Sequence, residues 1–349
     1  MDEILADTPL DGMTERIALA FSRALTLAKR HEGATAPNPP VGCILLDAAG
    51  QELSSGAHRR AGTPHAEAEA IAAARANGLG QAIHTLVVTL EPCNHHGRTP
   101  PCVDAILATE ARQIWIACPD PNSKVRGGGA ERLRAAGREV RFLSELNHPS
   151  APALAHEAER LLAPFAKRVR TGLPFVTIKQ AFSSIGSMLP PPGQKTFTSP
   201  VSLDLAHRLR RRADAILTGS GTVLADNPLF TVRLVPDHPD KRRLLVILDR
   251  RGRVTADYLA AARQRGFDVH LAQDLTQALA FIGAAGAMEV LVEAGPSLTD
   301  SLLATELWDE HVLIEQAADR NGADRVTIRR NSAVQVESNQ EKADVLRNH

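Results

Sequence analysis

Aromatic residues are scarce in this chain, at 3% of its 349 residues, with only two Trp and one Tyr. The cores must therefore be built mainly from Ala, Leu, Val and Ile. A surplus of charge is also absent, because 40 basic residues balance 40 acidic ones. A protein that binds nucleic acid usually carries a basic excess. We therefore expect no nucleic-acid partner.

Long apolar runs are missing, so no segment of the sequence approaches the length that a bilayer requires. The acidic start, MDEILADTPLDGM, lacks the basic and then apolar layout of a signal peptide. We therefore expect a cytoplasmic protein without a membrane partner. Four cysteines are too few for a disulfide framework in a chain of this length. Cys43 and Cys118 stand in apolar contexts and are predicted to be small buried hydrophobic residues.

Alternating apolar runs and helical patterns predict two α/β domains, and the length is sufficient for both. The first domain is predicted over residues 13–147, with strands in VGCILLD, HTLVVTL and QIWIAC. Its Ala-rich helix, AEAEAIAAARA, is predicted to have Thr63 as its N-cap and Pro64 at its first position. Residues 148–173 are the candidate linker. Residues 174–349 form the second domain, with a polar and weakly patterned tail.

One constellation of metal-binding residues stands out in the first domain. His65 opens the Ala-rich helix, Cys93 follows a strand, and Cys102 opens another helix after TPP. One imidazole and two thiolates supply three ligands of a tetrahedral zinc and leave the fourth position for water, which marks a catalytic site. Glu67, in His65-Ala66-Glu67, is then placed to move protons, as in the H-x-E and P-C motifs of zinc base deaminases. Cys93 and Cys102 are therefore predicted to bind metal and not to form a disulfide.

The residues themselves leave alternatives to this interpretation open. Each of these side chains taken alone would be an ordinary core or surface residue. His95 and His96 are further potential ligands, although a fourth protein ligand would close the zinc, and we expect them to line the mouth of the pocket. The same donor set also accepts iron. A non-catalytic, zinc-stabilised binding protein is an alternative from another class, but it has no use for Glu67.

The stretches APNPPVG, HAE, EPCNHHGRTPPC and DPNSKVRGGG resemble the deaminase half of the bifunctional riboflavin-biosynthesis RibD family. The resemblance implies a three-layer α/β domain like that of cytidine deaminases. It also implies hydrolytic removal of the 2-amino group from a diaminopyrimidinone ribosyl 5′-phosphate. Zinc would activate the water, and Glu67 would be catalytic. The positions that match substrate-binding residues are Asn38, His58, His95, Asp120, Asn122 and Lys124.

The second half carries two weaker signals, GSGT after a strand and AGPSL before a helix, which are turns that suit a phosphate. The surrounding residues 213–233 and 291–298 resemble the RibD reductase domain, which implies a dihydrofolate-reductase-like α/β fold and NADPH as cofactor. Asp226 matches a catalytic position as well as a cofactor position. The other positions that match cofactor-binding residues are Ala181, Thr196, Thr222, Gly295, Pro296 and Ser297. The positions that match substrate-binding residues are Lys179, Arg210, Arg233 and Glu293.

This half also departs from the family pattern. In KQAFSSIGSMLPPPG, Ile185 replaces an aspartate and Ser187 a basic residue, and the family's last strands are not recognisable after LWDEHVLI. Two interpretations follow. Either both activities persist, or the second domain has become a scaffold for dimerisation and only the deaminase works. The retained Asp226, Arg233 and Glu293 favour the bifunctional interpretation, and we expect a homo-oligomer.

Overall fold

The computed structural model describes residues 12–95, 100–122, 128–189, 193–194, 196–317 and 323–331. It divides into two compact units, Met1–Arg170 and Thr171–His349. No helix among these described residues is long and apolar enough to cross a membrane.

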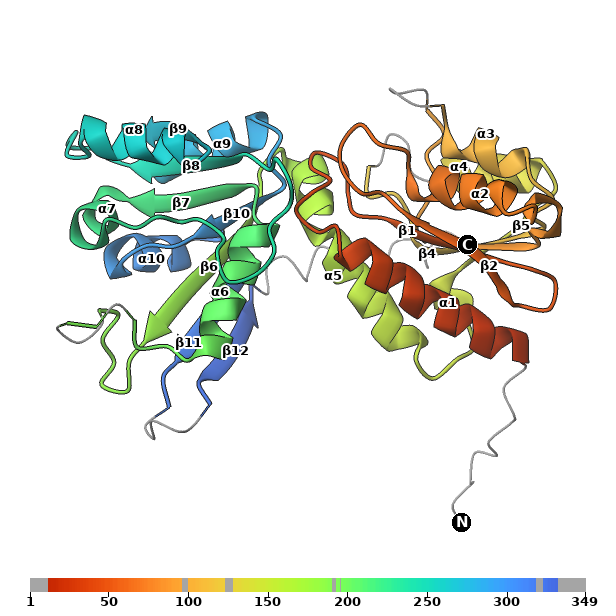
Figure 1. Ribbon diagram of the computed structural model, residues 1–349, viewed down its shortest axis with the longest axis horizontal. Helices are drawn as coiled ribbons and strands as arrows, with labels where there is room; N and C mark the ends of the chain where they lie inside the picture. Colours follow the sequence, from red (N-terminus) through yellow and green to blue (C-terminus); the bar gives the residue numbers. More distant parts are fainter. Residues whose placement is uncertain are drawn as a thin grey trace, which may run out of the picture. The chain divides into compact units, whose positions relative to one another are not determined.

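The first unit is built on a five-stranded sheet of order β2-β1-β3-β4-β5 (Figure 1). Its strands are β1 (Gly42–Leu46), β2 (Glu52–Ala57), β3 (Thr85–Leu90), β4 (Gln113–Cys118) and β5 (Glu139–Phe142). β1 runs antiparallel to β2 and β3, whereas β3, β4 and β5 are parallel to one another. The carboxyl ends of β3 and β4 therefore lie at one edge of the sheet, where ligands usually bind in such folds.

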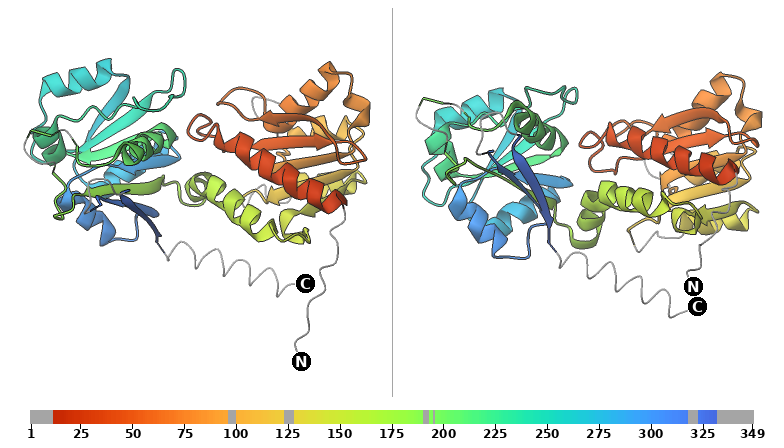
Figure 2. Two further views of the ribbon diagram at one scale, coloured as in Figure 1. Left: turned by 60° about the horizontal axis from the view of Figure 1, so that its bottom comes forward. Right: turned by 90° about the horizontal axis from the view of Figure 1, so that it is seen from below.

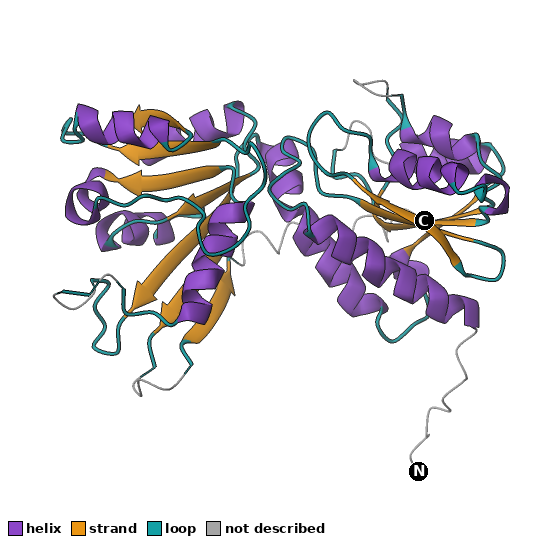
Figure 3. Ribbon diagram, viewed as in Figure 1, coloured by secondary structure: helices purple, strands orange, loops and turns teal. Residues whose placement is uncertain are grey.

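Helices cover both faces of this sheet. They are α1 (Gly12–Lys29), α2 (Ala66–Ala76), α3 (Cys102–Leu107), α4 (Gly128–Ala135) and α5 (Ala151–Thr171), with short 3₁₀ turns at Gly80–Ala82 and Leu143–Glu145. Figure 3 shows α1 and α5 on one side of the sheet and α2, α3 and α4 on the other. The predicted three-layer α/β architecture is thus confirmed. Cys43 and Cys118 are buried, as expected, and none of the four cysteines is in a disulfide.

The second unit contains a seven-stranded sheet of order β12-β11-β6-β10-β7-β8-β9. Its strands are β6 (Phe175–Phe182), β7 (Ala215–Gly219), β8 (Arg243–Leu248), β9 (Phe267–Ala272), β10 (Glu289–Val292), β11 (Glu310–Glu315) and β12 (Arg325–Arg330). Six of these strands are parallel, and β12 returns antiparallel along β11 (Figure 2). β10 inserts between β6 and β7, so that the carboxyl ends of these three strands are neighbours.

Residue alternation along these strands builds two cores, one on each face of the sheet. The helices are α6 (Pro200–Arg212), α7 (Ser220–Asp226), α8 (Ala256–Gln264), α9 (Leu275–Ala284) and α10 (Pro296–Leu303). Val290 and Val292 pack with α9 and α10, whereas Leu291 packs with α6, α7 and α8 on the other face. This alternation is the expected consequence of successive side chains pointing to opposite sides of a strand. The predicted mixed α/β class is confirmed for this unit also.

Several details differ from the sequence-based expectations. β12 lies in the tail that was expected to be weakly structured, where it pairs with β11 from Arg325 to Arg330. The candidate linker, residues 148–173, is not contradicted: it consists mostly of α5, and Leu154, Leu161 and Leu162 of this helix belong to the first core. Thr63 is not an N-cap, because α2 begins at Ala66 and the Thr63 hydroxyl instead donates to the Arg60 carbonyl at 2.8 Å.

Candidate functional sites

The three predicted metal ligands come together in the first unit. The Nδ1 atom of His65 lies 3.2 Å from Sγ of Cys102 and 3.7 Å from Sγ of Cys93. The three potential ligand atoms all lie within 4.8 Å of one another, and among the described residues no fourth His, Cys, Asp or Glu belongs to the group. His95 is exposed and is not a member, whereas His96 lies outside the described residues. Among the described residues, the three predicted ligands thus form one group that could hold a metal ion.

Local structure explains why these side chains meet. His65 is the N-cap residue of α2, and its ring turns toward the sulfurs instead of capping the helix. Gly56 lets β2 approach this helix closely, since a Cβ atom there would lie only 2.3 Å from the carbonyl oxygen of Ala66. Cys93 follows β3, and the backbone N–H of Cys102, at the start of α3, donates to its sulfur at 3.3 Å. Three separate elements thus each supply one ligand.

The charges at this cluster suit a metal and a proton carrier. A hydrogen bond from Cys102, helped by His65, lowers the pKa of the Cys93 thiol to about 4, which favours the thiolate that a metal requires. Glu67 is only 3% exposed. Burial raises the pKa of Glu67, and the negative charge of Cys93 adds to this increase. A carboxyl group with a raised pKa is able to hold a proton for part of a reaction cycle.

His58 and Asn38 form a polar pair beside the metal cluster. The His58 ring meets the His65 ring edge to face, with 5.2 Å between the centroids. Nδ1 of His58 donates to the Pro64 carbonyl at 3.1 Å, which leaves Nε2 to accept from the Asn38 amide at 3.4 Å. Burial lowers the pKa of His58 and favours this neutral ring. Both predicted substrate residues thus lie near the metal ligands in a defined orientation.

Glu91 was not singled out as a functional residue from the sequence, yet it organises this edge of the sheet. Its carboxylate is 4% exposed. It accepts the backbone N–H groups of Asp120, Gly129 and Ala130, each at 3.1 Å. Asp120 in turn accepts from the backbone N–H of Asn122 at 2.8 Å. The residue two positions before Cys93 thereby fixes Asp120 and, through it, Asn122, which are two predicted substrate residues after β4. A third, Lys124, lies outside the described residues.

Replacing Glu91 by Gln tests this clamp. All three partners are N–H donors, so the amide nitrogen of Gln must face a donor in either orientation. We expect the free energy of unfolding of the first unit to fall by about 1–3 kcal/mol, the cost of an unsatisfied buried group. Glu139→Gln, at an exposed carboxylate that accepts from Gln113, is the matched control and should change it by less than about 0.5 kcal/mol. Equal denaturation midpoints for the two variants would contradict the proposed clamp.

The second constellation surrounds Glu293, directly after β10. Arg210 of α6 donates to both of its carboxylate oxygens, with N···O distances of 2.7 and 3.1 Å, and Nζ of Lys179 lies 3.2 Å away. Burial alone would raise the pKa of Glu293, but the two cations outweigh it and lower that pKa to about 2. Three predicted substrate residues from β6, α6 and the end of β10 thus form one buried ionic cluster.

Arg233 and Thr222 border this cluster. Arg233 is exposed, and its guanidinium donates to the Thr231 hydroxyl at 2.7 Å. The positive charge of Arg210 contributes to a lowered pKa of Arg233, after burial, which places the two guanidinium groups in one electrostatic environment. The Thr222 hydroxyl accepts the backbone N–H of Gly295 at 3.0 Å and so ties α7 to the start of α10. The site lies at the carboxyl ends of β6, β7 and β10, where parallel sheets usually bind ligands.

The two halves of the chain, which carry the two sites, each match a known family model. The family model of the cytidine and deoxycytidylate deaminase zinc-binding region matches residues 14–118, and that of the RibD C-terminal domain matches residues 174–316. The riboflavin biosynthesis protein RibD of Escherichia coli is 34% identical over 326 residues, which cover 84% of this chain and 85% of that protein. The chain belongs to the RibD family.

Other RibD proteins agree in sequence and in structure. RibD of Mycobacterium tuberculosis is 37% identical over 300 residues, which cover 81% of each chain. Acinetobacter baumannii RibD superposes with a TM-score of 0.73 at 30% identity, over 89% of this chain and 90% of that one. A Thermotoga maritima structure, described as a diaminohydroxyphosphoribosylaminopyrimidine deaminase and 5-amino-6-(5-phosphoribosylamino)uracil reductase, has a TM-score of 0.74 over 89% of each chain. As a RibD protein, this chain combines a zinc-dependent deaminase with a reductase.

The residues present fit the groups that the RibD family uses. One imidazole nitrogen and two sulfurs, one of them a thiol with a depressed pKa, suit zinc. For NADPH, the N-terminal turn of α10 follows Gly295, and a Cβ atom on Gly221 would meet nothing within 4 Å, which leaves open space beside the start of α7. Both groups therefore have places consistent with their chemistry.

The remaining reductase residues predicted from the resemblance are more scattered. Asp226 ends α7 and is exposed, Pro296 and Ser297 begin α10, and Ala181 is half-buried near the end of β6. Thr196 is exposed and its hydroxyl lies 2.9 Å from that of Thr198. The structure thus unites Lys179, Arg210 and Glu293 in one contact network but gives no side-chain contact between Asp226 and that network.

The segment that departs from the RibD pattern forms a local turn after β6. The backbone N–H of Ser183 donates to the Ser187 carbonyl and that of Gly186 to the Ser183 carbonyl, both at 2.8 Å. Gly186 has a φ of +77°, which favours glycine there. Ile185 projects from this turn with 88% of its surface exposed. The replaced aspartate position is therefore outside the core of this unit.

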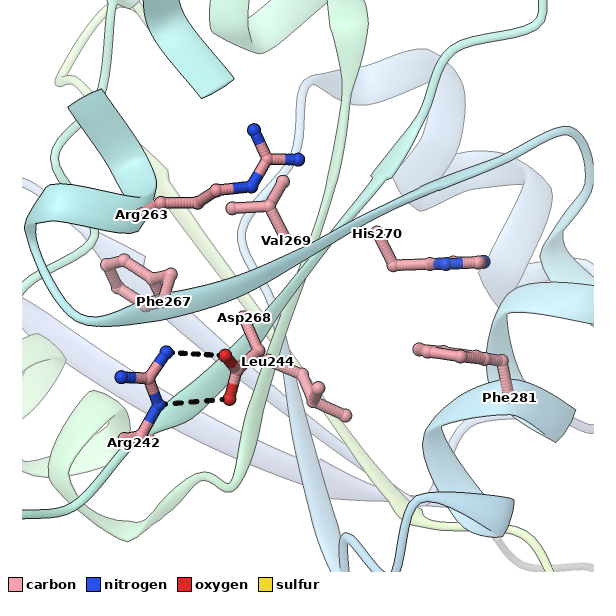
Figure 4. A pocket seen from close by; sticks show the side chains of 8 residues that line it. All are labelled: Arg242, Leu244, Arg263, Phe267, Asp268, Val269, His270 and Phe281. Carbon is pink, nitrogen blue, oxygen red and sulfur yellow. Dashed lines mark hydrogen bonds and ion pairs between the residues drawn. The ribbon is translucent and has the colours of Figure 1, made fainter. Parts of the chain in front are cut away.

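A surface pocket occurs at one edge of the second sheet, at β8 and β9 (Figure 4). Asp268 makes two contacts with Arg242 there, at 3.2 and 2.5 Å, and the His270 ring stacks on Phe281 with 3.8 Å between centroids. None of the predicted site residues lines this pocket. We therefore assign it no part in catalysis.

Proposed function

We propose that this chain acts twice in riboflavin biosynthesis. It would deaminate 2,5-diamino-6-ribosylamino-4(3H)-pyrimidinone 5′-phosphate and then reduce the ribosyl group of the product to a ribityl chain with NADPH. The observation that carries the proposal is the open cluster of His65, Cys93 and Cys102 beside the buried carboxyl group of Glu67. The description of the Thermotoga maritima structure names the same pair of activities, and the name of the E. coli relative supports riboflavin biosynthesis.

In the deamination, one water and the amino group of the pyrimidine exchange at a ring carbon, and ammonia leaves. Zinc held by His65, Cys93 and Cys102 would lower the pKa of the attacking water. Glu67 takes a proton from that water on a carboxylate oxygen and delivers it to the departing nitrogen. We assign Asn38, His58, His95, Asp120, Asn122 and Lys124 to binding of the base and the ribosyl phosphate. The neutral ring of His58 and the clamped loop at Asp120 support this assignment.

In the reduction, the C1′ carbonyl of the ring-opened ribosyl group gains a hydride and a proton. We assign Arg210 and Arg233 to the substrate phosphate, because guanidinium groups match phosphate oxygens in geometry and charge. Glu293 and Lys179 complete this substrate site. Asp226 is assigned as the catalytic carboxylate. Thr222, Gly295, Pro296 and Ser297 would hold NADPH, together with Ala181 and Thr196.

A run of arginines after β8 supports NADPH over NADH. Arg250, Arg251 and Arg253 are exposed and follow the carboxyl end of β8, beside β7 and α7. The guanidinium of Arg253 donates to the Ser220 hydroxyl, at the start of α7, at 3.0 Å. An arginine in this region is suited to the 2′-phosphate that distinguishes the two cofactors. The sequence signal, RRGR directly after a strand, was readable but was not used in the predictions.

We further propose residues 13–147 as the deaminase domain and residues 174–349 as the reductase domain, joined by residues 148–173. A homo-oligomer remains a prediction. The alternative, a deaminase with a non-catalytic second domain, is weakened by the ionic cluster at Glu293. A buried carboxylate with two cations costs desolvation, and a scaffold gains little stability from it that apolar residues would not provide.

A coupled assay on the full-length, zinc-loaded protein tests both reactions. With the diaminopyrimidinone phosphate and NADPH supplied, ammonia release and NADPH oxidation are followed separately. We expect both, with NADPH oxidation dependent on prior deamination and slower with NADH. Ammonia release without NADPH oxidation would leave the deaminase-only alternative. The absence of both activities would overturn the proposed function.

A further inference from the structure

His207 is a buried histidine of α6 that neither predicted reaction uses. It lies three residues before Arg210, on the same side of the helix, and only 4% of its surface is exposed. Its Nδ1 atom accepts the backbone N–H of Arg233 at 2.9 Å. This bond requires a lone pair on Nδ1, so the ring must be neutral with its proton on Nε2.

Two bonds from α6 hold the segment that carries Arg233. His207 binds the backbone N–H of Arg233, and the guanidinium of Arg210 lies 3.4 Å from the Thr231 carbonyl oxygen. Within the segment, the Arg233 side chain donates to the Thr231 hydroxyl. α6 therefore fixes the backbone at Arg233, and Thr231 of the same segment directs the side chain of this exposed cation.

We propose that His207 is a positioning residue that holds Arg233 for the substrate phosphate, and that protonation of its ring releases this hold. A second ring proton would place an N–H group against the N–H of Arg233. It would also add positive charge beside two guanidinium groups. This inference rests on the proposed role of Arg233 in the reductase.

The charges around His207 favour the neutral ring near pH 7. They are Arg210 and Asp204 on α6, Arg233 on the loop after α7, and Glu293 after β10. Burial is the largest cause of the lowered pKa of His207, and the two arginines lower it further, against the opposite effects of Glu293 and Asp204. The hold on Arg233 should therefore be complete at neutral pH and should weaken in acid.

Two substitutions separate the role of His207 as a hydrogen-bond acceptor from the effect of protonating its ring. In His207→Asn, the amide oxygen takes the place of Nδ1 but does not titrate. In His207→Leu, the acceptor is lost. His270→Asn, at the β9 edge pocket, is a matched control in the same unit. The probe is ribose 5-phosphate, whose binding to the full-length protein is followed at pH 5 to 8 by the backbone amide signal of Arg233.

In the wild type, we expect the dissociation constant of the probe to rise in acid in two proton-dependent steps. In His207→Asn, only one step should remain, which belongs to the phosphate itself, whose second pKa is about 6. His207→Leu should bind roughly tenfold more weakly at pH 7.5, as expected for one lost hydrogen bond to a buried partner. The Arg233 amide should then exchange faster with solvent.

Two proton-dependent steps in His207→Asn, or equal amide exchange in the wild type and His207→Leu, would overturn the proposal. Because the readout is binding and exchange, it does not depend on turnover. A wild type that fails to oxidise NADPH would contradict the proposed reductase function, while the same titrations would still decide the role of His207.

Discussion

Glu67→Gln should lower the rate of ammonia release by about 10²–10⁴-fold, which is the usual contribution of a general acid–base group. The expectation follows from position and burial. Glu67 lies in the first turn of α2, two residues after the proposed metal ligand His65, and is almost inaccessible to solvent. Glutamine preserves the shape of the side chain but cannot accept a proton from water. The measurement is ammonia production by the full-length, zinc-loaded variant at saturating substrate.

The zinc content of this variant is the essential control. Glu67 does not belong to the three-ligand cluster, so Glu67→Gln should keep one equivalent of zinc at that cluster. Glu131→Gln, at an exposed carboxylate of α4, should leave both zinc and rate unchanged. A Glu67→Gln enzyme with full activity would exclude Glu67 as the proton carrier and would require another group to move the proton. Loss of zinc together with activity would instead show that Glu67 supports the metal.

The metal site was predictable because its signals are local. His65 and Glu67 share one helical turn, and both cysteines follow recognisable element boundaries. The clamp at Glu91 was not predictable in the same way. Its partners are backbone N–H groups 29, 38 and 39 residues further along the chain. A glutamate at the end of a strand gives no sequence signal for such partners, because backbone donors exist at every position other than proline.

The missed strands have a common physical cause. β2, β5 and β12 lie at the edges of their sheets, and their side chains are largely half-buried or exposed. Without a buried face they lack a clear apolar period, which is the main strand signal in a sequence. The position of β10 between β6 and β7 was likewise not encoded locally, since its hydrophobic run is compatible with any interior position.

The reductase residues were predictable only in part. Lys179, Arg210 and Glu293 were found through resemblance, and the structure brings them into direct contact. His207 precedes Arg210 by three residues on α6 and so shares its face. Its partner, the backbone of Arg233, is 26 residues distant in sequence and only the fold reveals it.

Glu293→Gln should destabilise the reductase unit more than any other single charge removal proposed for it. The carboxylate is buried, and both of its partners, Arg210 and Lys179, are largely buried as well. Removing one side of such a cluster leaves uncompensated charge, at a cost of about 3–5 kcal/mol. In a unit of this size, a loss of 3 kcal/mol corresponds to a fall of roughly 6–12 °C in Tm. Thermal unfolding of the full-length protein measures it, with the reductase transition identified by its increase in Tm when NADPH is added.

Glu315→Gln is the matched control. Oε2 of Glu315 lies 3.0 Å from Nε of Arg325, but this ion pair lies on the surface. It should change the stability by no more than about 1 kcal/mol.

The pH dependence gives a second check. The pKa of Glu293 is lowered in the folded state, so its contribution is fully present above its unfolded pKa of about 4.5 and disappears as pH falls toward about 2. The difference in stability between wild type and Glu293→Gln should therefore be constant from neutral pH down to about 5 and shrink below that. A difference that grew in acid, or equal Tm values for Glu293→Gln and Glu315→Gln, would show that the cluster around Glu293 does not stabilise this unit.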